Sequence, residues 1–247
     1  MAFQTIFKRY ELKYMLTIEQ KERVIESMKP FMKPDKYGRT TIRNLYFDTD
    51  SYLLIRRSIE KPVYKEKLRI RSYSKADADS EVFVELKKKY RHVVYKRRMS
   101  LSETEAMKWL SGEKHIDKHT QISNEIDYFM KFYGKLHPTV FLSYEREAYY
   151  ANDGTDFRIT FDDNILCRQG DLSLRSDVYG TPILPEDKVL VEIKCCGGIP
   201  LWMVEVLSRE EIYKTPFSKY GTAYKTLIFP QTHKLNSYNM LEVTTNA

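Results

Sequence analysis

The stretch VYKEKLRIRSY (residues 63–73), with VFVELKKKYRHVVYKRRMSL (residues 82–101) after it, alternates basic and apolar side chains with a period of two. In the first segment Lys67, Arg69 and Arg71 fall on one face, and Leu68 and Ile70 fall on the other. Side chains of a β-strand point alternately to opposite faces, so this period predicts strands rather than helices. The short segment between residues 90 and 93 predicts a hairpin connection.

Further segments of the chain share this period and the Tyr and Val content that favours strands. The predicted strands are Phe7–Tyr14, Arg43–Asp48, Val63–Tyr73, Val82–Tyr90, Val93–Leu101, Thr139–Ala151, Arg158–Asp163 and Val189–Cys195.

Helices are predicted in the gaps between these strands. Capping-box patterns at Thr17 and Ser102 predict the starts of two helices. Residues 122–133 carry apolar side chains at helical spacing and predict a third. Pro200 suits the first turn of a fourth helix over Leu201–Leu207. Many strands with few helices between them indicate an antiparallel α+β fold, and no linker divides residues 1–247, so we expect a single domain.

The polar faces of the strands carry more cations than carboxylates. The side chains sharing these faces are Arg9, Glu11 and Lys13; Lys65, Lys67, Arg69 and Arg71; Glu85, Lys87 and Lys89; Lys96 and Arg98; Arg146; Arg158 and Asp162; Glu192 and Lys194. One interpretation is a sheet with a solvated charged face. The other is a closed barrel with a charged lumen and helices packed outside, which needs an anion inside because unpaired cations are costly to enclose. Phosphate fits Arg and Lys, and the carboxylates would suit Mg²⁺ or Mn²⁺.

Composition excludes several classes of protein. The chain has 247 residues, 42% hydrophobic and 30% charged, with a net charge of +7 and a pI near 9.0. This content excludes a disordered chain, and the basic balance favours an anionic partner. No stretch is apolar enough for a membrane span, and no signal peptide is recognised. The odd number of cysteines, three, argues against a disulfide framework, so we expect a cytoplasmic location.

Several segments resemble the VTC domain, the catalytic domain of polyphosphate polymerases in the CYTH-like triphosphate tunnel superfamily. The similar segments span nearly the whole chain in the family's order: RYELKY (Arg9–Tyr14), LYFDT (Leu45–Thr49), KLRIRSY (Lys67–Tyr73), VFVELKKKYRHVVYKRR (Val82–Arg98), SYEREAY (Ser143–Tyr149), FRITFDDNI (Phe157–Ile165), LVEIKC (Leu190–Cys195) and FSKYGTAY (Phe217–Tyr224). The resemblance implies an antiparallel barrel that forms a tunnel. No SPX regulatory domain and no membrane segment are recognised, as in a stand-alone bacterial-type member.

The resemblance also implies roles for individual residues. Catalytic cations are expected at Arg69, Arg71, Lys87, Arg146 and Arg158. Phosphate-binding cations are expected at Lys13, Lys67, Lys96, Arg98, Lys194 and Lys219. The metal-binding glutamate resembles Glu192, and Glu11 or Glu85 could assist it; Asp48, Asp50, Asp162 and Asp163 suit turns and caps as well as they suit a metal.

The leading hypothesis is a phosphoryl transferase that makes polyphosphate from ATP with Mn²⁺ or Mg²⁺. A tunnel-type triphosphatase that hydrolyses inorganic or nucleoside triphosphate is the first alternative, and a non-catalytic polyphosphate-binding module is the second. The expected ligands are ATP, triphosphate and polyphosphate, not nucleic acid. A membrane protein is a further candidate partner, since this chain has no predicted membrane span of its own. No Walker loop or dinucleotide motif is present in the sequence.

Overall fold

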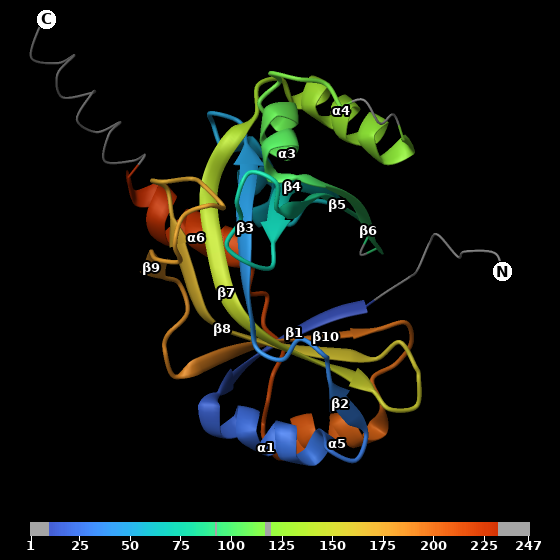
Figure 1. Cartoon of the computed structure of the whole chain (residues 1–247). Helices are drawn as coiled ribbons and strands as arrows, with labels where there is room; N and C mark the ends of the chain where they lie inside the picture. The colour runs from blue at the N-terminus through green and yellow to red at the C-terminus, as the bar shows by residue number, and fades with distance from the viewer. Residues whose placement is uncertain (1–9, 92, 117–119, 232–247) are drawn as a thin grey trace, which may run out of the picture.

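A ten-stranded antiparallel sheet organises the chain, as a computed structural model that describes residues 10–91, 93–116 and 120–231 shows (Figure 1). The strands are β1 (Tyr10–Thr17), β2 (Met32–Pro34), β3 (Thr40–Asp48), β4 (Tyr64–Ser72), β5 (Glu81–Tyr90), β6 (Val93–Ser102), β7 (His137–Ala151), β8 (Arg158–Arg168), β9 (Thr181–Pro182) and β10 (Lys188–Cys195). The helices are α1 (Ile18–Met28), α2 (Leu53–Ile59), α3 (Glu103–Leu110), α4 (Gln121–Tyr133), α5 (Leu201–Arg209) and α6 (Lys219–Ala223), which a π-helical turn continues (Tyr224–Ile228).

Every long predicted strand and each of the four predicted helices is present. Residues 7–9 of the first predicted strand lie outside the described residues, as does His92 in the predicted hairpin. Thr17 and Ser102 cap α1 and α3 with the reciprocal hydrogen bonds of a capping box, as their sequence patterns predict.

The sheet is strongly bent but follows an open path. Its order is β1-β10-β8-β7-β3-β4-β5-β6, with β2 and β9 beside β7 and β8, and the two edge strands β1 and β6 do not pair within the described ranges. Figure 1 shows β1 and β10 below and β4–β6 above, joined through the long strands β3 and β7. Register shifts interrupt β3–β7 pairing at Tyr46/Phe47 and β7–β8 pairing at Ser143/Glu145, and such irregularities bend a strand. The prediction of a closed barrel is therefore not confirmed, whereas the antiparallel sheet is.

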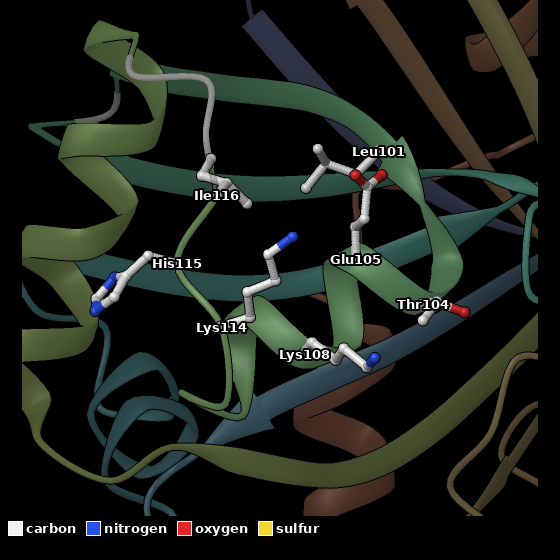
Figure 2. A pocket seen from close by; sticks show the side chains of 7 residues that line it. All are labelled: Leu101, Thr104, Glu105, Lys108, Lys114, His115 and Ile116. Carbon is white, nitrogen blue, oxygen red and sulfur yellow. The ribbon is translucent and has the colours of Figure 1, made fainter.

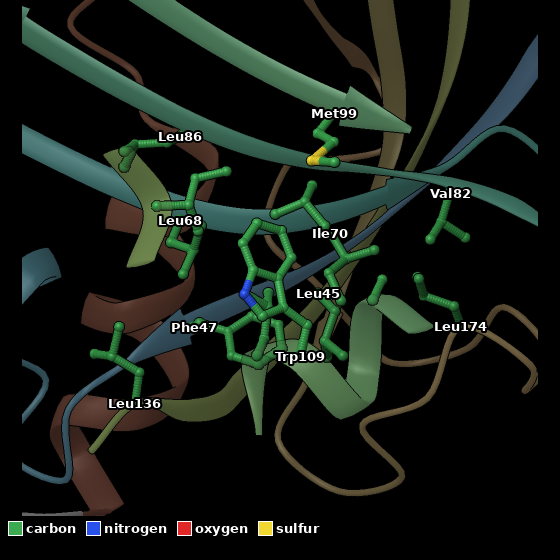
Figure 3. Close-up of a cluster of buried hydrophobic side chains, with 14 of the residues drawn as sticks. Leu45, Phe47, Leu68, Ile70, Val82, Leu86, Met99, Trp109, Leu136 and Leu174 are labelled. Carbon is green, nitrogen blue, oxygen red and sulfur yellow. The ribbon is translucent and has the colours of Figure 1, made fainter. Parts of the chain in front are cut away.

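The outer face of the sheet carries two apolar cores. Trp109 of α3 is 1% exposed and packs with Leu68 and Ile70 of β4 in the first core (Figure 3), and its indole Nε1 donates a hydrogen bond to Asp127 of α4. Burying each such side chain contributes about 1.5–3 kcal/mol. The second core lies where α1 and α5 pack on β1, β8 and β10. These cores cover the outer face of the sheet. The inner face carries most of the charged side chains of the strands, together with a third apolar cluster that includes Ile42 of β3 and Leu142 of β7.

Helix α6 is an exception to the prediction that helices pack outside. Its Tyr220 stacks on Tyr46 of β3 with ring centroids 4.5 Å apart, and its Lys219 reaches Asp162 of β8. Both contacts are on the inner face, so the outside location is correct for α1, α3, α4 and α5 and wrong for α6. The physical reason is that Tyr220 and Ala223 of α6 belong to a buried apolar cluster with Leu142 of β7, while Lys219 finds its carboxylate partner on the same face.

Candidate active site on the inner face

The predicted site residues come together on the inner face of the sheet. Strands β4, β5 and β6 form one wall of this face, and β1, β8 and β10 form the opposite wall, with β7 between them. The first wall carries Lys67, Arg69, Arg71, Glu85, Lys87, Lys96 and Arg98; the second carries Glu11, Lys13, Arg158, Glu192 and Lys194; Arg146 comes from β7 and Lys219 from α6. Cations outnumber carboxylates on the first wall and over the inner face as a whole, whereas Asp162 of β8 brings the second wall close to balance.

Glu85 is the centre of the first wall. Its carboxylate is 1% exposed and lies 2.6 Å from a guanidinium nitrogen of Arg69, 2.8 Å from Nε of Arg98 and 2.6 Å from Nζ of Lys96. Arg71 approaches to 4.0 Å. Burial raises the pKa of Glu85, but Arg69, Arg71 and Lys96 outweigh that effect and hold the pKa well below its usual range. This carboxylate therefore stays ionised and fixes the cations around it.

Neutral side chains that the sequence interpretation missed fix the same guanidinium groups. Arg69 donates to the hydroxyl of Tyr46 at 3.0 Å, and Arg71 donates to the hydroxyl of Tyr144 at 3.0 Å. Arg71 also donates from Nε to Asn44 at 2.9 Å. The positions of Asn44 and Tyr46 on alternate residues of β3 could have identified them as inner-face residues, although nothing in the sequence pairs them with these arginines.

Asp162 is the centre of a second cluster. It is fully buried and accepts two hydrogen bonds from Arg146, at 2.6 and 2.7 Å, and one from Lys219 at 2.5 Å. Burial raises the pKa of Asp162, but Arg146 and Lys219 outweigh it and lower that pKa. Asp162 is thus an ion-pair partner, whereas Asp48 accepts backbone N–H groups of Leu54 and Ile55 at the start of α2.

Glu192 lies between four cations, and Lys219 donates a long hydrogen bond to it. Its oxygens are 3.4 Å from Lys13, 3.5 Å from Lys219, 3.6 Å from Arg146 and 3.7 Å from Lys194. Burial raises its pKa, but Lys219 and then Lys13 outweigh that effect and hold the pKa well below the usual range. The carboxylate is therefore ionised, and its contacts with these cations are longer than those of Glu85 and Asp162 with theirs.

Glu11 on β1 lies near Glu192 and joins the two walls. Its carboxylate is 3.0 Å from Nζ of Lys87 on β5 and 3.7 Å from Nζ of Lys13. Burial raises the pKa of Glu11, Lys87 lowers it, and the net result is a pKa of about 2. Register places Glu11 opposite Lys194, and Lys13 opposite Glu192.

Two of the predicted site cations, Lys67 and Arg158, have no carboxylate partner among the described residues. Lys67 donates to the hydroxyl of Ser218 at 3.2 Å, and burial, then the charge of Lys13, lowers its pKa to about 7. Nε of Arg158 is buried without a hydrogen-bond partner, and its guanidinium lies 4.7 Å from the ring centroid of Tyr150. Such groups need an external anion, because an unpaired buried cation is costly.

The carboxylates fit a divalent metal only together with a phosphorylated ligand. No group of three or more His, Cys, Asp or Glu side chains suited to a metal occurs within the described residues. Mg²⁺ is commonly bound through one or two carboxylates plus substrate phosphates, so the loosely engaged Glu192 with Glu11 beside it suits that arrangement. Glu85 suits it less, because its oxygens already accept from Arg69, Arg98 and Lys96.

A separate pocket lies on the outer side, between α3 and the segment that follows it (Figure 2). Its lining residues are Leu101, Thr104, Glu105, Lys108, Lys114, His115 and Ile116, and none of the predicted site residues is among them. The remaining aspartates of the predicted acidic cluster also lie away from the inner face. Asp50 is near His137, at 3.3 Å, and Asp163 pairs with Arg39.

The chain is similar to several solved structures. A candidate adenylate cyclase from Bacillus halodurans superposes with a TM-score of 0.52 at 16% identity, over 86% of this chain and 94% of that one. A candidate adenylyl cyclase from Hippeastrum, described as having a dominant triphosphatase activity, gives a TM-score of 0.49 at 14% identity, over 87% and 94%. At 16% identity the first of these supports the fold alone.

Sequence comparison identifies the family. None of the curated proteins matches the chain significantly. In the portion that the structure describes, no helix has the length and apolar character needed to cross a membrane. The sequence model of the VTC domain matches residues 8–228, which include every strand and helix described above. The protein therefore belongs to the VTC domain family.

Proposed function

We propose that this protein is a metal-dependent phosphoryl transferase that makes inorganic polyphosphate from ATP on its cationic inner face. The observation that carries the proposal is the unbalanced charge of that face. Lys67 and Arg158 have no carboxylate partner in the part of the chain that the structure describes, while Glu192 lies 3.4 Å from Lys13 and 3.5 Å from Lys219. A linear phosphate chain supplies the missing negative charge, and membership of the VTC domain family supports this class of ligand.

Phosphoryl transfer needs little covalent participation by the protein, since positioning and charge stabilisation supply most of the catalysis. A terminal oxygen of the growing chain would attack the γ-phosphorus of ATP, the bond from that phosphorus to the bridging oxygen would break, and ADP would leave. The attacking oxygen is already ionised, so no general base is required. We assign charge stabilisation of the transferred group to Arg69, Arg71, Lys87, Arg146 and Arg158.

The remaining cations would hold the nucleotide and the chain. We assign that role to Lys13, Lys67, Lys96, Arg98, Lys194 and Lys219. Glu192, with Glu11, would hold Mn²⁺ or Mg²⁺, which supplies charge neutralisation at the phosphate oxygens when bound. Glu85 would instead hold Arg69, Arg98 and Lys96 in place, because it is buried among them.

Product analysis tests the proposal. The protein is incubated with ATP and Mn²⁺, or with Mg²⁺, and the products are separated on a gel that resolves polyphosphate chains while ADP is measured in parallel. Long chains appearing in step with ADP support the polymerase. Orthophosphate as the product would replace the proposal with a triphosphatase, and binding of triphosphate without turnover would replace it with a binding module. A Glu192→Gln variant and a chelated sample are the controls.

A further inference from the structure

The basic face of the first wall continues beyond the cluster around Glu85. The register pairs Arg69 with Glu85, Lys67 with Lys87, and Lys65 with Lys89, in that order along β4 and β5. Strand alternation places Lys65 and Lys89 on the same inner face as Arg69 and Glu85. The Lys65–Lys89 pair lies four residues from the Arg69–Glu85 pair, which is roughly 13 Å along the strands.

This end of the wall lacks a counter-charge among the residues that the structure describes. In the described part of the chain neither Lys65 nor Lys89 forms an ion pair, and the ammonium group of Lys65 donates only to the backbone carbonyl of Ser58, at 3.1 Å. Both side chains are half-buried. Two like charges directly opposite one another destabilise a sheet, so the arrangement costs stability unless an anion lies across it.

The electrostatics of Lys65 agree with that geometry. Burial is the main cause that lowers the pKa of Lys65, and the charges of Lys89, Lys13 and Lys87 lower it further. Lys96 differs, because there the charge of Glu85 raises the pKa against the effect of burial. Lys65 and Lys89 therefore form a local concentration of positive charge facing the inner space.

We propose that Lys65 and Lys89 form an anion subsite for linear polyphosphate, binding phosphates of the chain beyond those held at Arg69 and Arg71. The proposal rests on the proposed function and extends it, since one triphosphate held at the arginines is too short to reach the Lys65–Lys89 pair as well. The Lys67–Lys87 pair lies between the Arg69–Glu85 pair and the Lys65–Lys89 pair, two residues from each along the strands. A triphosphatase has no use for such an extension, whereas a growing chain must pass along it.

Metal-free binding measurements test the subsite. Calorimetry compares inorganic tripolyphosphate with a long-chain polyphosphate on the wild type and on a Lys65→Ala/Lys89→Ala variant. We expect the variant to bind tripolyphosphate within about twofold of the wild type. Its affinity for the long chain should fall about tenfold, which is the effect of about 1.4 kcal/mol. The salt dependence of long-chain binding should also become shallower, because fewer counterions are released.

The matched control is Lys36→Ala/Lys131→Ala, which removes two exposed lysines from the loop after β2 and from α4. It should leave both affinities unchanged. An equal loss for both ligands in the Lys65→Ala/Lys89→Ala variant, an unchanged affinity for the long chain, or the same loss in the control would each overturn the subsite. The variant removes a like-charge pair, so denaturant unfolding should show stability equal to or above that of the wild type.

The outcome is separable from that of the proposed function. The binding experiment contains neither ATP nor metal, so it does not depend on turnover. If ATP yields only orthophosphate, the polymerase proposal fails while a length-dependent binding loss would still establish the subsite. If long chains form but the variant binds them normally, the subsite fails and the polymerase proposal stands.

Discussion

Glu11 on β1 and Lys87 on β5 form an ion pair of 3.0 Å that joins two strands on opposite walls of the sheet. No strand pairing connects these walls directly in the described residues, since β1 and β6 are the edges of an open path. The inner space is therefore bordered on this side by side chains and not by backbone hydrogen bonds.

This pair should contribute little to stability. Lys87 is 39% and Glu11 21% exposed, and pairs in such settings contribute roughly 0–1 kcal/mol because water screens them. In a double-mutant cycle of Glu11→Gln and Lys87→Met, we expect a coupling below about 1 kcal/mol by denaturant unfolding. A coupling above about 2 kcal/mol would show instead that the pair locks the two walls together.

Replacing Asp162 by Asn should destabilise the protein strongly. The change leaves Arg146 and Lys219 buried without their closest carboxylate, and breaking a buried pair in this way costs about 3–5 kcal/mol. Added tripolyphosphate should raise the melting temperature of the variant more than that of the wild type, because it replaces the missing charge. Asp163→Asn is the control, since that carboxylate is partly exposed on the other face. A loss no larger than in this control would contradict the assignment.

The sequence predicts which side chains share a face of the sheet, but it does not predict whether the sheet closes into a barrel. The alternation in β4 places Lys67, Arg69 and Arg71 together correctly, because the period of a strand is fixed by backbone geometry. The same alternation holds in an open sheet and in a closed barrel, so it could not show that β1 and β6 remain apart. That outcome depends on bends such as the one at Tyr46/Phe47, which carry no sequence pattern.

The sequence also does not predict which charged side chains form ion pairs with one another. Alternation places Glu85 on the inner face but does not show that Arg69, Arg98 and Lys96 surround its carboxylate. Helix α6 was missed because five residues that include Gly221 give no helical period. The family resemblance predicts a phosphate-binding role for Lys219, and the structure places this residue on the inner face beside Asp162 and Glu192.

Arg158→Ala should weaken triphosphate binding without destabilising the fold. The guanidinium of Arg158 forms no ion pair within the described ranges, and its Nε has no hydrogen-bond partner, so its removal leaves no carboxylate uncompensated. Charge-assisted hydrogen bonds contribute about 1.5–3 kcal/mol, which corresponds to a roughly tenfold to hundredfold loss of affinity. Calorimetry with tripolyphosphate, together with thermal unfolding, checks both parts. Unchanged affinity would remove Arg158 from the site.

Lys67 should make triphosphate affinity depend on pH. Its pKa of about 7 in the free protein is lowered by burial and by Lys13, and a bound anion would raise it. Affinity should therefore be fully present below about pH 7 and decline as the pH rises above it, with protons taken up on binding. The ligand titrates too, so the comparison is with Lys67→Arg, whose charge is constant. If the two proteins lose affinity in parallel between about pH 6 and pH 9, Lys67 does not titrate on binding.

Glu192→Gln separates the two roles open to that carboxylate. As a metal ligand, Glu192 is required for turnover, which should collapse in the variant while metal-free triphosphate binding survives. That binding should even tighten, because Lys13, Lys219, Arg146 and Lys194 lose a competing negative charge. As an ion-pair partner only, Glu192 would affect stability, and the remaining activity would keep the metal dependence of the wild type. Turnover, metal titration and metal-free calorimetry on the same preparation distinguish these outcomes. Wild-type turnover with the same Mn²⁺ requirement would rule out metal ligation by Glu192. Lost turnover with retained triphosphate binding would instead show that the glutamine side chain cannot replace the carboxylate as a metal ligand.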